Sequence, residues 1–145
     1  MTMENPEYLV EGPIPESYIR LESAGRPRLT PAGAHAIFLG QVRDDLVDGK
    51  TVTGIEYSAY ADMIAPVVEA IREELFNEFS DLMRVDILHS TGLVKCGEIS
   101  LLVGVSSGHR KQSFAALEKC VDLIKEKLPV WKKELFTDGS SRWIQ

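Results

Sequence analysis

The feature that most constrains the fold is a change of hydrophobic period that occurs twice along the chain. Two segments, 61–79 and 110–128, carry apolar residues at three- and four-residue steps, which is the period of an amphipathic helix. Each follows two shorter runs rich in apolar or β-branched residues, which are typical of strands. The order β-β-α-β-β-α-β predicts an α+β domain with two helices on a mostly antiparallel sheet.

The boundaries of these elements follow from local signals. Pro129 should end the second helix, because the residue before a proline avoids the helical region. Asp48 and Gly49 indicate a loop or hairpin turn, and Gly92 a second turn. The predicted strands are 34–42, 52–60, 82–89, 98–105 and 130–136. The predicted buried stripes are Ile64, Val67, Val68, Ile71, Leu75 and Phe79 on the first helix, and Phe114, Leu117, Val121, Ile124 and Leu128 on the second.

The length of 145 residues favours one domain. Residues 1–33 hold five of the seven prolines, so we expect an irregular N-terminal segment with one short strand at 8–10 and a helical turn near 17–21. Residues 34–145 then form the single domain.

Charge is distributed unevenly. Residues 1–108 carry 8 Lys and Arg against 17 Asp and Glu, whereas residues 109–145 carry 8 against 5. An acidic body argues against a nucleic-acid binder. The basic quarter fits a site for a small anion or an acidic partner, or a chance cluster of helix-surface lysines.

Two cysteines are too few for a disulfide framework, and the three histidines lack metal-ligand spacing. The apolar runs are too short to span a membrane, and the N-terminus has no signal-peptide pattern. We therefore expect a cytoplasmic protein without a metal, a disulfide or a membrane span.

His109 and Arg110 open the second helix, directly after two serines and a glycine. Free backbone N–H groups at such a start can hold an anion. Arg110 falls on the predicted apolar stripe, where an arginine needs an anionic partner. The alternative is a simple helix cap with a salt bridge.

Lys125 and Lys132 flank the Pro129 break, so the chain can turn and bring both amines to one cleft. Lysines are also favoured in the last helical turn for dipole reasons alone. Arg43 follows a buried strand and either belongs to a site or pairs with the adjacent aspartates. His35 and His89 are interpreted as core or surface residues of strands.

Several of these residues belong to longer motifs. The chain resembles the family of large, catalytic subunits of molybdopterin synthase over about residues 34–143. The resemblance is carried by FLGQVR at 38–43, EY at 56–57 with Tyr60 and Met63, HSTG at 89–92 leading to Gly97-Glu98, VGVSSGHR at 103–110 and KEKLPVWKKE at 125–134. Ser90 departs from the pattern, because arginine is common there.

The resemblance implies an α/β-hammerhead fold and a sulfur-transfer reaction. The family converts cyclic pyranopterin monophosphate (precursor Z) into the molybdopterin dithiolene, using a thiocarboxylate on the C-terminal Gly-Gly of a small ubiquitin-like subunit. The implied assembly is a homodimer of large subunits within a heterotetramer, with no cofactor.

The resemblance also implies the site residues. It assigns catalysis to Lys125 and Lys132. It assigns substrate binding to Arg43, His109, Arg110, Phe38, Met63 and, from the neighbouring subunit, Arg142. The alternative function is a non-catalytic, small-ligand-binding α+β regulatory module, which would need neither Lys125 nor a ubiquitin-like partner.

Overall fold

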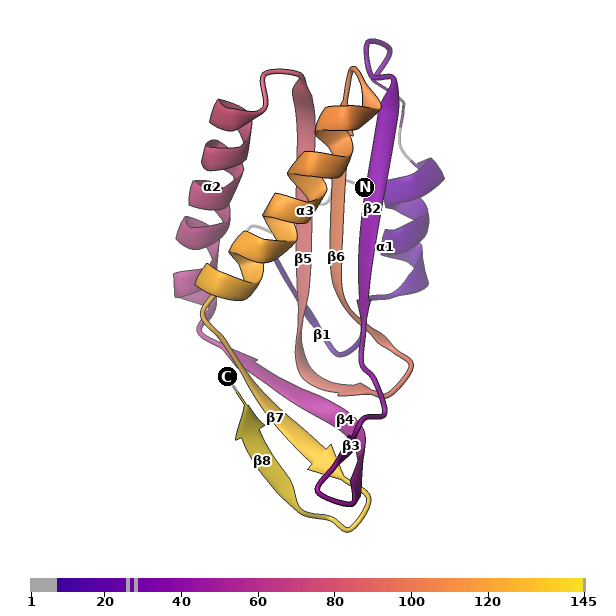
Figure 1. Cartoon of the computed structure of the whole chain (residues 1–145), viewed down its shortest axis with the longest axis vertical. Helices are drawn as coiled ribbons and strands as arrows, with labels where there is room; N and C mark the ends of the chain where they lie inside the picture. The colour runs from indigo at the N-terminus through magenta and orange to yellow at the C-terminus, as the bar shows by residue number, and fades with distance from the viewer. Residues whose placement is uncertain (1–7, 26, 28, 145) are drawn as a thin grey trace.

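The structure, a computed structural model, describes residues 8–25, 27 and 29–144, and its strands lie side by side with helices on both faces (Figure 1). In chain order the elements are β1 (Leu9–Glu11), α1 (Glu16–Arg20), the π-helical turn η1 (Leu21–Gly25), β2 (Ala34–Gln41), β3 (Leu46–Val47), β4 (Lys50–Ala59), α2 (Ala61–Glu78), β5 (Leu82–Lys95), β6 (Ile99–Ser107), α3 (Arg110–Lys127), β7 (Val130–Phe136) and β8 (Ser141–Ile144).

The main sheet has the strand order β2-β6-β5-β4-β7-β8, and every pair along this path is antiparallel. The short β1 adds a parallel pairing to β5, and β3 forms a hairpin with β4 around Asp48 and Gly49, which both have positive φ. The predicted α+β class and the mostly antiparallel sheet are confirmed.

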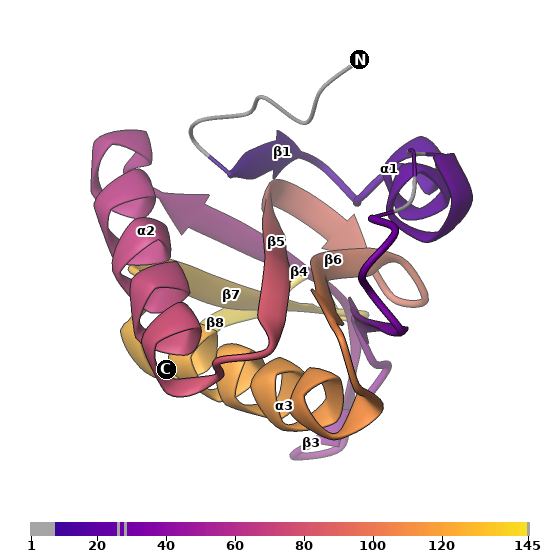
Figure 2. The same cartoon turned by 90° about the horizontal axis from the view of Figure 1, so that it is seen from above.

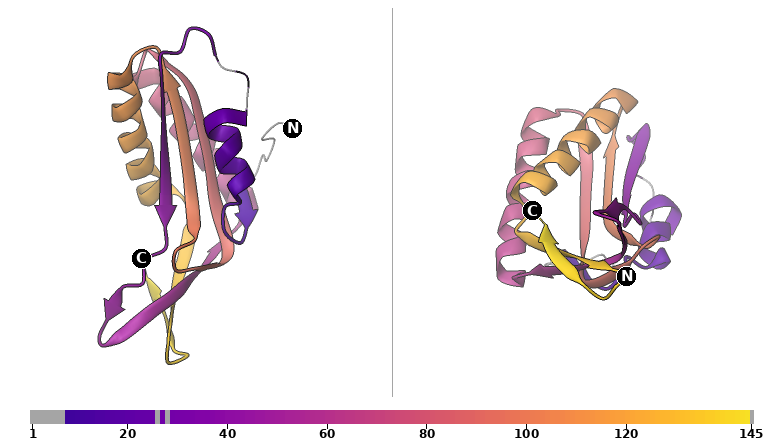
Figure 3. Two further views of the ribbon diagram at one scale, coloured as in Figure 1. Left: turned by 90° about the vertical axis from the view of Figure 1, so that its right-hand side faces the viewer. Right: turned by 60° about the horizontal axis from the view of Figure 1, so that its bottom comes forward.

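β5 bends, and the bend divides the sheet in two. Its first half pairs with β6 from Leu82 to His89, and its last residues pair with β4 from Gly92 to Lys95. The half-sheet of β4, β7 and β8 therefore projects from the lower end of the molecule (Figures 1 and 3). Gly92 has φ +78°, a conformation that side chains with a Cβ avoid.

The turn predicted at Gly92 is wrong. β5 runs on to Lys95, and the turn into β6 lies at Cys96 and Gly97 instead. Both glycines have positive φ, so the sequence offers two equivalent turn signals. Only the first of them serves as a bend within a strand.

The main core lies between α2, α3 and the β5–β6 half of the sheet (Figure 2). The period predicted for the first helix is confirmed by α2, which buries Ile64, Val68, Ile71 and Leu75. These side chains pack against the inner residues of the strands, which include Val85, Ile87, Leu101, Val103 and Val105.

The phase predicted for the second helix is wrong at its start. Phe114 is 66% exposed, and α3 instead buries Ser113, Ala116, Cys120, Leu123 and Ile124. Three of these five side chains are small, so the helix can approach the sheet closely. Arg110 is exposed as well, and does not lie on the buried face.

A third helix covers the other face of the sheet. Ile14, which precedes α1, packs against Leu88 and Leu102, with Tyr18 and Ile19 of α1 beside them (Figure 3). β6 is thus buried on both faces, which explains its nearly continuous apolar sequence. None of the helices in the described part of the chain is long and apolar enough to cross a membrane.

The bend in β5 predicts a specific cost for a side chain at Gly92. A Cβ there would collide with the Glu11 carboxylate, whereas a Cβ on Gly97 would meet open space. Each change to alanine should cost about 1–2 kcal/mol of unfolding free energy for the left-handed backbone. Gly92→Ala should cost more than Gly97→Ala in urea unfolding, and adding Glu11→Ala should remove the excess. Equal losses for the two glycines would contradict the steric argument.

Candidate active site

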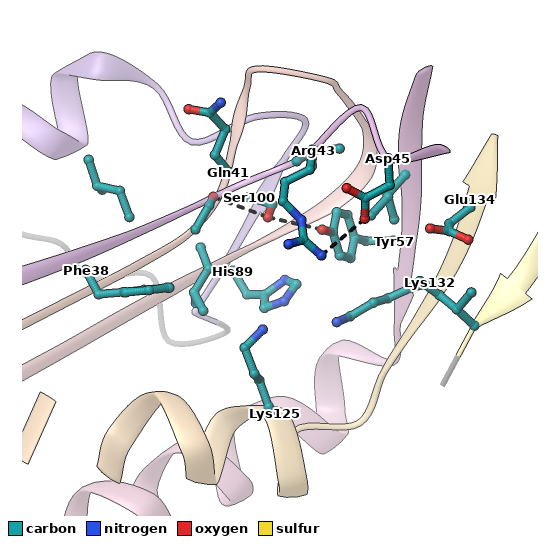
Figure 4. A pocket seen from close by; sticks show the side chains of 16 residues that line it. Phe38, Gln41, Arg43, Asp45, Tyr57, His89, Ser100, Lys125, Lys132 and Glu134 are labelled. Atoms are coloured by element: carbon teal, nitrogen blue, oxygen red, sulfur yellow. Dashed lines mark hydrogen bonds and ion pairs between the residues drawn. The ribbon is translucent and has the colours of Figure 1, made fainter. Parts of the chain in front are cut away.

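A cavity of about 360 Å³ opens where the two halves of the sheet meet the end of α3 (Figure 4). Strands β2, β4, β5, β6, β7 and β8 all contribute side chains to it. Its polar lining residues are Gln41, Arg43, Asp45, Tyr57, His89, Ser100, Lys125, Lys132 and Glu134.

The break at Pro129 brings two lysines into this cavity. α3 ends at Lys127, Leu128 is extended with ψ 124°, and β7 begins at Val130. Lys125 therefore enters the cavity from the last helical turn, and Lys132 enters from the strand that follows (Figure 4). The predicted convergence of the two amines is confirmed.

These two lysines differ from their neighbours in their partners. Lys127 lies 3.5 Å from a Glu74 carboxylate oxygen, and Lys133 lies 3.1 Å from one of Glu56. Among the described residues, neither Lys125 nor Lys132 has a carboxylate within ion-pair distance. Their positive charges are therefore available to a ligand.

Burial makes the positive charge of Lys132 energetically unfavourable. Desolvation, and after it the positive charge of Lys125, lowers the pKa of the Lys132 ammonium below its ordinary value of 10.5. A bound anion would reverse the second effect, because it neutralises the repulsion between the two amines.

The other charged groups of the cavity are paired. Arg43 lies 3.1 Å from Asp45, and Glu134 accepts a hydrogen bond of 2.8 Å from Arg142. These pairs cancel locally, so the excess positive charge comes from the two lysines. The arrangement is suited to a ligand with one or two negative charges.

A hydrogen-bonded wall lies opposite the lysines. The Tyr57 hydroxyl donates to the Ser100 oxygen at 3.1 Å, and burial raises the pKa of the Tyr57 phenol. The His89 ring meets the Tyr57 ring edge-on, with centroids 5.1 Å apart. Burial lowers the pKa of His89 from 6.5 to about 4, so this histidine is neutral at pH 7.

Comparison with known proteins decides the family. The MoaE protein family model matches residues 15–127, which is more than half of the chain. The chain belongs to the MoaE family.

Individual members of the family agree with this. The chain is 41% identical over 114 residues to the molybdopterin synthase catalytic subunit of Dictyostelium discoideum, covering 77% of this chain and 72% of that protein. The crystal structure of molybdopterin synthase from Staphylococcus aureus matches with a TM-score of 0.82 and 31% identity, covering 94% and 95% of the two chains. A complex of subunits 1 and 2 of the molybdopterin-converting factor from Helicobacter pylori, at 19% identity, has the same fold, with a TM-score of 0.68 and coverage of 94% and 88%.

Four of the eight residues that the sequence motifs predicted for a MoaE-type site line this one cavity. They are Phe38, Arg43, Lys125 and Lys132. Arg142 reaches its rim within the same chain, through the bond to Glu134. Met63 is exposed in the first turn of α2 and does not line the cavity.

His109 and Arg110 lie at the opposite end of α3. Lys125 lies fifteen residues after Arg110 on the same helix, which corresponds to about 22 Å along the axis. Within one MoaE chain His109 and Arg110 therefore do not join Arg43 and the two lysines in one substrate-binding cavity.

The start of α3 is also already occupied. The Asp81 carboxylate accepts a hydrogen bond of 2.6 Å from the His109 backbone N–H, and the Gln112 side chain accepts one from the Asp81 backbone. The structure thus favours the alternative of a helix cap, because a carboxylate from the loop between α2 and β5 binds the backbone N–H of the N-cap residue His109 in place of a ligand.

Sequence reasoning missed the wall of the cavity. His89, Tyr57, Ser100 and Glu134 were not predicted as site residues. A signal existed for Glu134, since a two-residue step on a strand puts it on the same face as Lys132.

In the described part of the chain no group of three His, Cys, Asp or Glu side chains could hold a metal ion.

The cap predicts a stability effect without a loss of the site. Asp81→Ala removes the acceptor for the His109 N–H and should lower the unfolding free energy by about 0.5–2 kcal/mol in urea unfolding. Asp122→Ala, an exposed change on the same helix, is the control and should stay within about 0.5 kcal/mol. Equal effects of the two changes would mean that Asp81 does not cap α3.

Proposed function

We propose that this chain is the catalytic subunit of a molybdopterin synthase in molybdenum cofactor biosynthesis. It accepts sulfur from the C-terminal thiocarboxylate of a small ubiquitin-like subunit. It transfers this sulfur to cyclic pyranopterin monophosphate and forms the molybdopterin dithiolene. Family membership supports the synthase activity, and the chemistry of the cavity supports the anionic reactants.

The observation that carries the proposal is a pair of lysines in one cavity that have no carboxylate partner among the residues the structure describes. Every reacting species of this transfer is an anion: the cyclic phosphate, the thiocarboxylate, and the oxyanion that forms when the carbonyl of the tail is attacked. Two ammonium groups held in a partly buried site stabilise such charges more strongly than water does.

The two lysines have different surroundings, and we assign them different roles. Lys125 is exposed at the cavity mouth and acts at the reacting carbons, as acid/base or electrostatic stabiliser. Lys132 is half-buried beside Tyr57 and Glu134 and positions the substrate and the incoming tail. Arg43 contributes to phosphate binding, for which its exposed pair with Asp45 would open.

The small subunit needs a docking surface next to the cavity. The outer face of α3 offers one: Phe114, Leu117 and Val121 line a second, shallower cavity of about 280 Å³ together with Phe38. Phe38 also lines the lysine cavity, so the two cavities lie next to each other. We propose that the small subunit binds on this apolar surface and that its tail enters between the lysines.

We further propose a homodimer of this subunit within a heterotetramer. His109 and Arg110 are exposed and lie too far from the lysines of their own chain to share a ligand with them. They can bind substrate only in the cavity of a neighbouring copy. Arg142 has a partner in its own chain, so its predicted reach into the neighbour requires opening of the Glu134 pair.

The lysine pair predicts a loss of turnover without a loss of folding. The unfolding free energy of Lys125→Ala should lie within about 1 kcal/mol of that of the unsubstituted chain, since only a helix-end dipole interaction is removed. It should lower the synthase rate by about 10²–10³, because the removed charge acts on the developing oxyanion. The assay uses thiocarboxylated small subunit and precursor Z, alongside thermal melts.

The chain provides matched controls for both lysines. Lys127→Ala and Lys133→Ala remove amines that pair with Glu74 and Glu56 instead of facing the cavity. Both should retain activity, whereas Lys132→Ala should raise the KM for precursor Z or for the small subunit. If Lys127→Ala loses as much activity as Lys125→Ala, the catalytic assignment of Lys125 fails. An unsubstituted chain without any synthase activity would instead support the regulatory-module alternative.

The docking surface predicts the effect of a charge at Phe114. Because this side chain is exposed, Phe114→Asp should leave the thermal melt unchanged. It should weaken binding of the small subunit by about tenfold or more, as for a central apolar contact. Phe76→Asp, at an exposed phenylalanine of α2, is the control.

The proposed assembly predicts a mass. Light scattering of the mixture of the two subunits should give the mass of two copies of each subunit, and a persistent 1:1 complex would contradict the dimer.

A further inference from the structure

His89 is a buried, chemically competent group that the proposed mechanism does not use. It lies on β5, is 6% exposed and lines the lysine cavity. Figure 4 shows its ring between Tyr57 on one side and the ends of Lys125 and Lys132 on the other. A polar ring in this position needs a hydrogen-bonding role on both nitrogens.

One nitrogen of the ring already has its role. Nδ1 lies 2.8 Å from the backbone carbonyl oxygen of Ser90. A carbonyl oxygen can only accept, so Nδ1 carries the proton and donates it to Ser90. The neutral ring then has an unprotonated Nε2, whose lone pair can accept a hydrogen bond. The edge-on packing of Tyr57 at 77° fixes the plane of the ring.

The charge of the surroundings keeps the ring in this neutral form. Burial is the main effect on the pKa of His89, and the nearby ammonium groups of Lys132 and Lys125 lower this pKa as well. The charged or titratable groups that line the same cavity are Arg43, Asp45, Tyr57, Lys125, Lys132 and Glu134. The carboxylates among them are committed to Arg43 and Arg142, which leaves no acid to stabilise an imidazolium.

Lys132 has the complementary requirement. It is a half-buried ammonium without a carboxylate partner among the described residues, and a buried donor of this kind is unfavourable unless an acceptor satisfies it. The His89 ring and the Lys132 amine lie in the same cavity, near enough for the charge of Lys132 to act on the ring, and Nε2 is the free acceptor of that ring (Figure 4). The lysine stem is flexible, whereas the imidazole is fixed on the strand.

We propose that His89 is a positioning residue: its neutral Nε2 accepts a hydrogen bond from the Lys132 ammonium and aims this amine at the anion bound in the cavity. The ring supplies an acceptor without adding a negative charge that would repel the anionic ligand. A carboxylate at this position would hold the lysine equally well and cancel the charge on which anion binding depends. The effect on turnover rests on the proposed function, whereas the tautomer and the lysine contact do not.

Protonation of His89 should therefore limit the activity at low pH. An imidazolium would lose its acceptor and add a third positive charge beside the two lysines. Since the pKa in the folded chain lies below that of the unfolded chain, His89 contributes stability that is present above pH 6.5 and is lost as the pH falls toward about 4. Activity should fall over the lower part of that window.

Two substitutions separate the functions of the two ring nitrogens. His89→Asn keeps a donor near the position of Nδ1, for Ser90, but has no acceptor at the position of Nε2. His89→Gln carries an amide oxygen to the position of Nε2, and this acceptor does not protonate. We expect His89→Asn to lower kcat/KM about tenfold or more, as for loss of a hydrogen bond to a charged group. His89→Gln should recover most of the loss and remove the decline at low pH. His35→Gln, at an exposed histidine outside the cavity, should leave the pH profile unchanged.

Two NMR measurements on the isolated chain test the proposal without any assay. In ¹⁵N-histidine-labelled chain, His89 should show an unprotonated Nε2 that titrates near pH 4. In ¹³C-lysine-labelled chain, the Cε resonance of Lys132 should titrate at lower pH in His89→Asn than in the unsubstituted chain or in His89→Gln. A proton on Nε2 at pH 7, a titration near 6.5, or an unchanged Lys132 titration would overturn the proposal. If His89→Asn does not fold, the titration of the unsubstituted chain still decides. Correct titrations with no synthase activity in any variant would instead refute the proposed function.

Discussion

The change of strand partners along β5 is the constraint on which the rest of the structure depends. A strand has two edges, and the edge of β5 opposite β6 is shared in sequence by β1 and then β4. Gly92 lies where the partner of β5 changes from β1 to β4, and it has a backbone conformation that only glycine adopts without strain. The bend turns β4, β7 and β8 away from the first half of the sheet. Residues of both halves line the cavity, which therefore lies where the two halves meet (Figure 4).

The periodic elements could be predicted from the sequence, and the contacts between them could not. α2 and the longer strands β2, β4, β5, β6 and β7 follow from local patterns, whereas the short β3 and β8 were not predicted. The buried face predicted for α3 is wrong because hydrophobicity favours Phe114, whereas close packing against a sheet favours small side chains such as Ala116 and Cys120. A similar limit applies at His109, where the acceptor for the backbone N–H at the start of α3, Asp81, comes from a loop 28 residues away.

The site was predictable in part. The Pro129 break favoured the meeting of Lys125 and Lys132, and their motif suggested a role. The protonation of His89 and the pairing of the two lysines cannot be predicted from a local sequence pattern. The neutrality of His89 arises from burial and from lysines on two other elements. The lack of a carboxylate partner for Lys132 among the described residues follows from the register of β4 against β7. In that register Lys133 stands opposite Glu56, whereas Lys132 stands opposite Tyr57.

The position of the cavity relative to α3 explains why the site depends on side chains. An anion is favoured at the N-terminus of a helix, but here that end is capped by Asp81, and the cavity lies at the C-terminal end. The carbonyl groups exposed there repel an anion and favour a cation in the last turn, where Lys125 lies. The affinity of the cavity for a negative ligand must then come from the amines, and their mutual repulsion, visible in the lowered pKa of Lys132, is relieved only when that ligand binds.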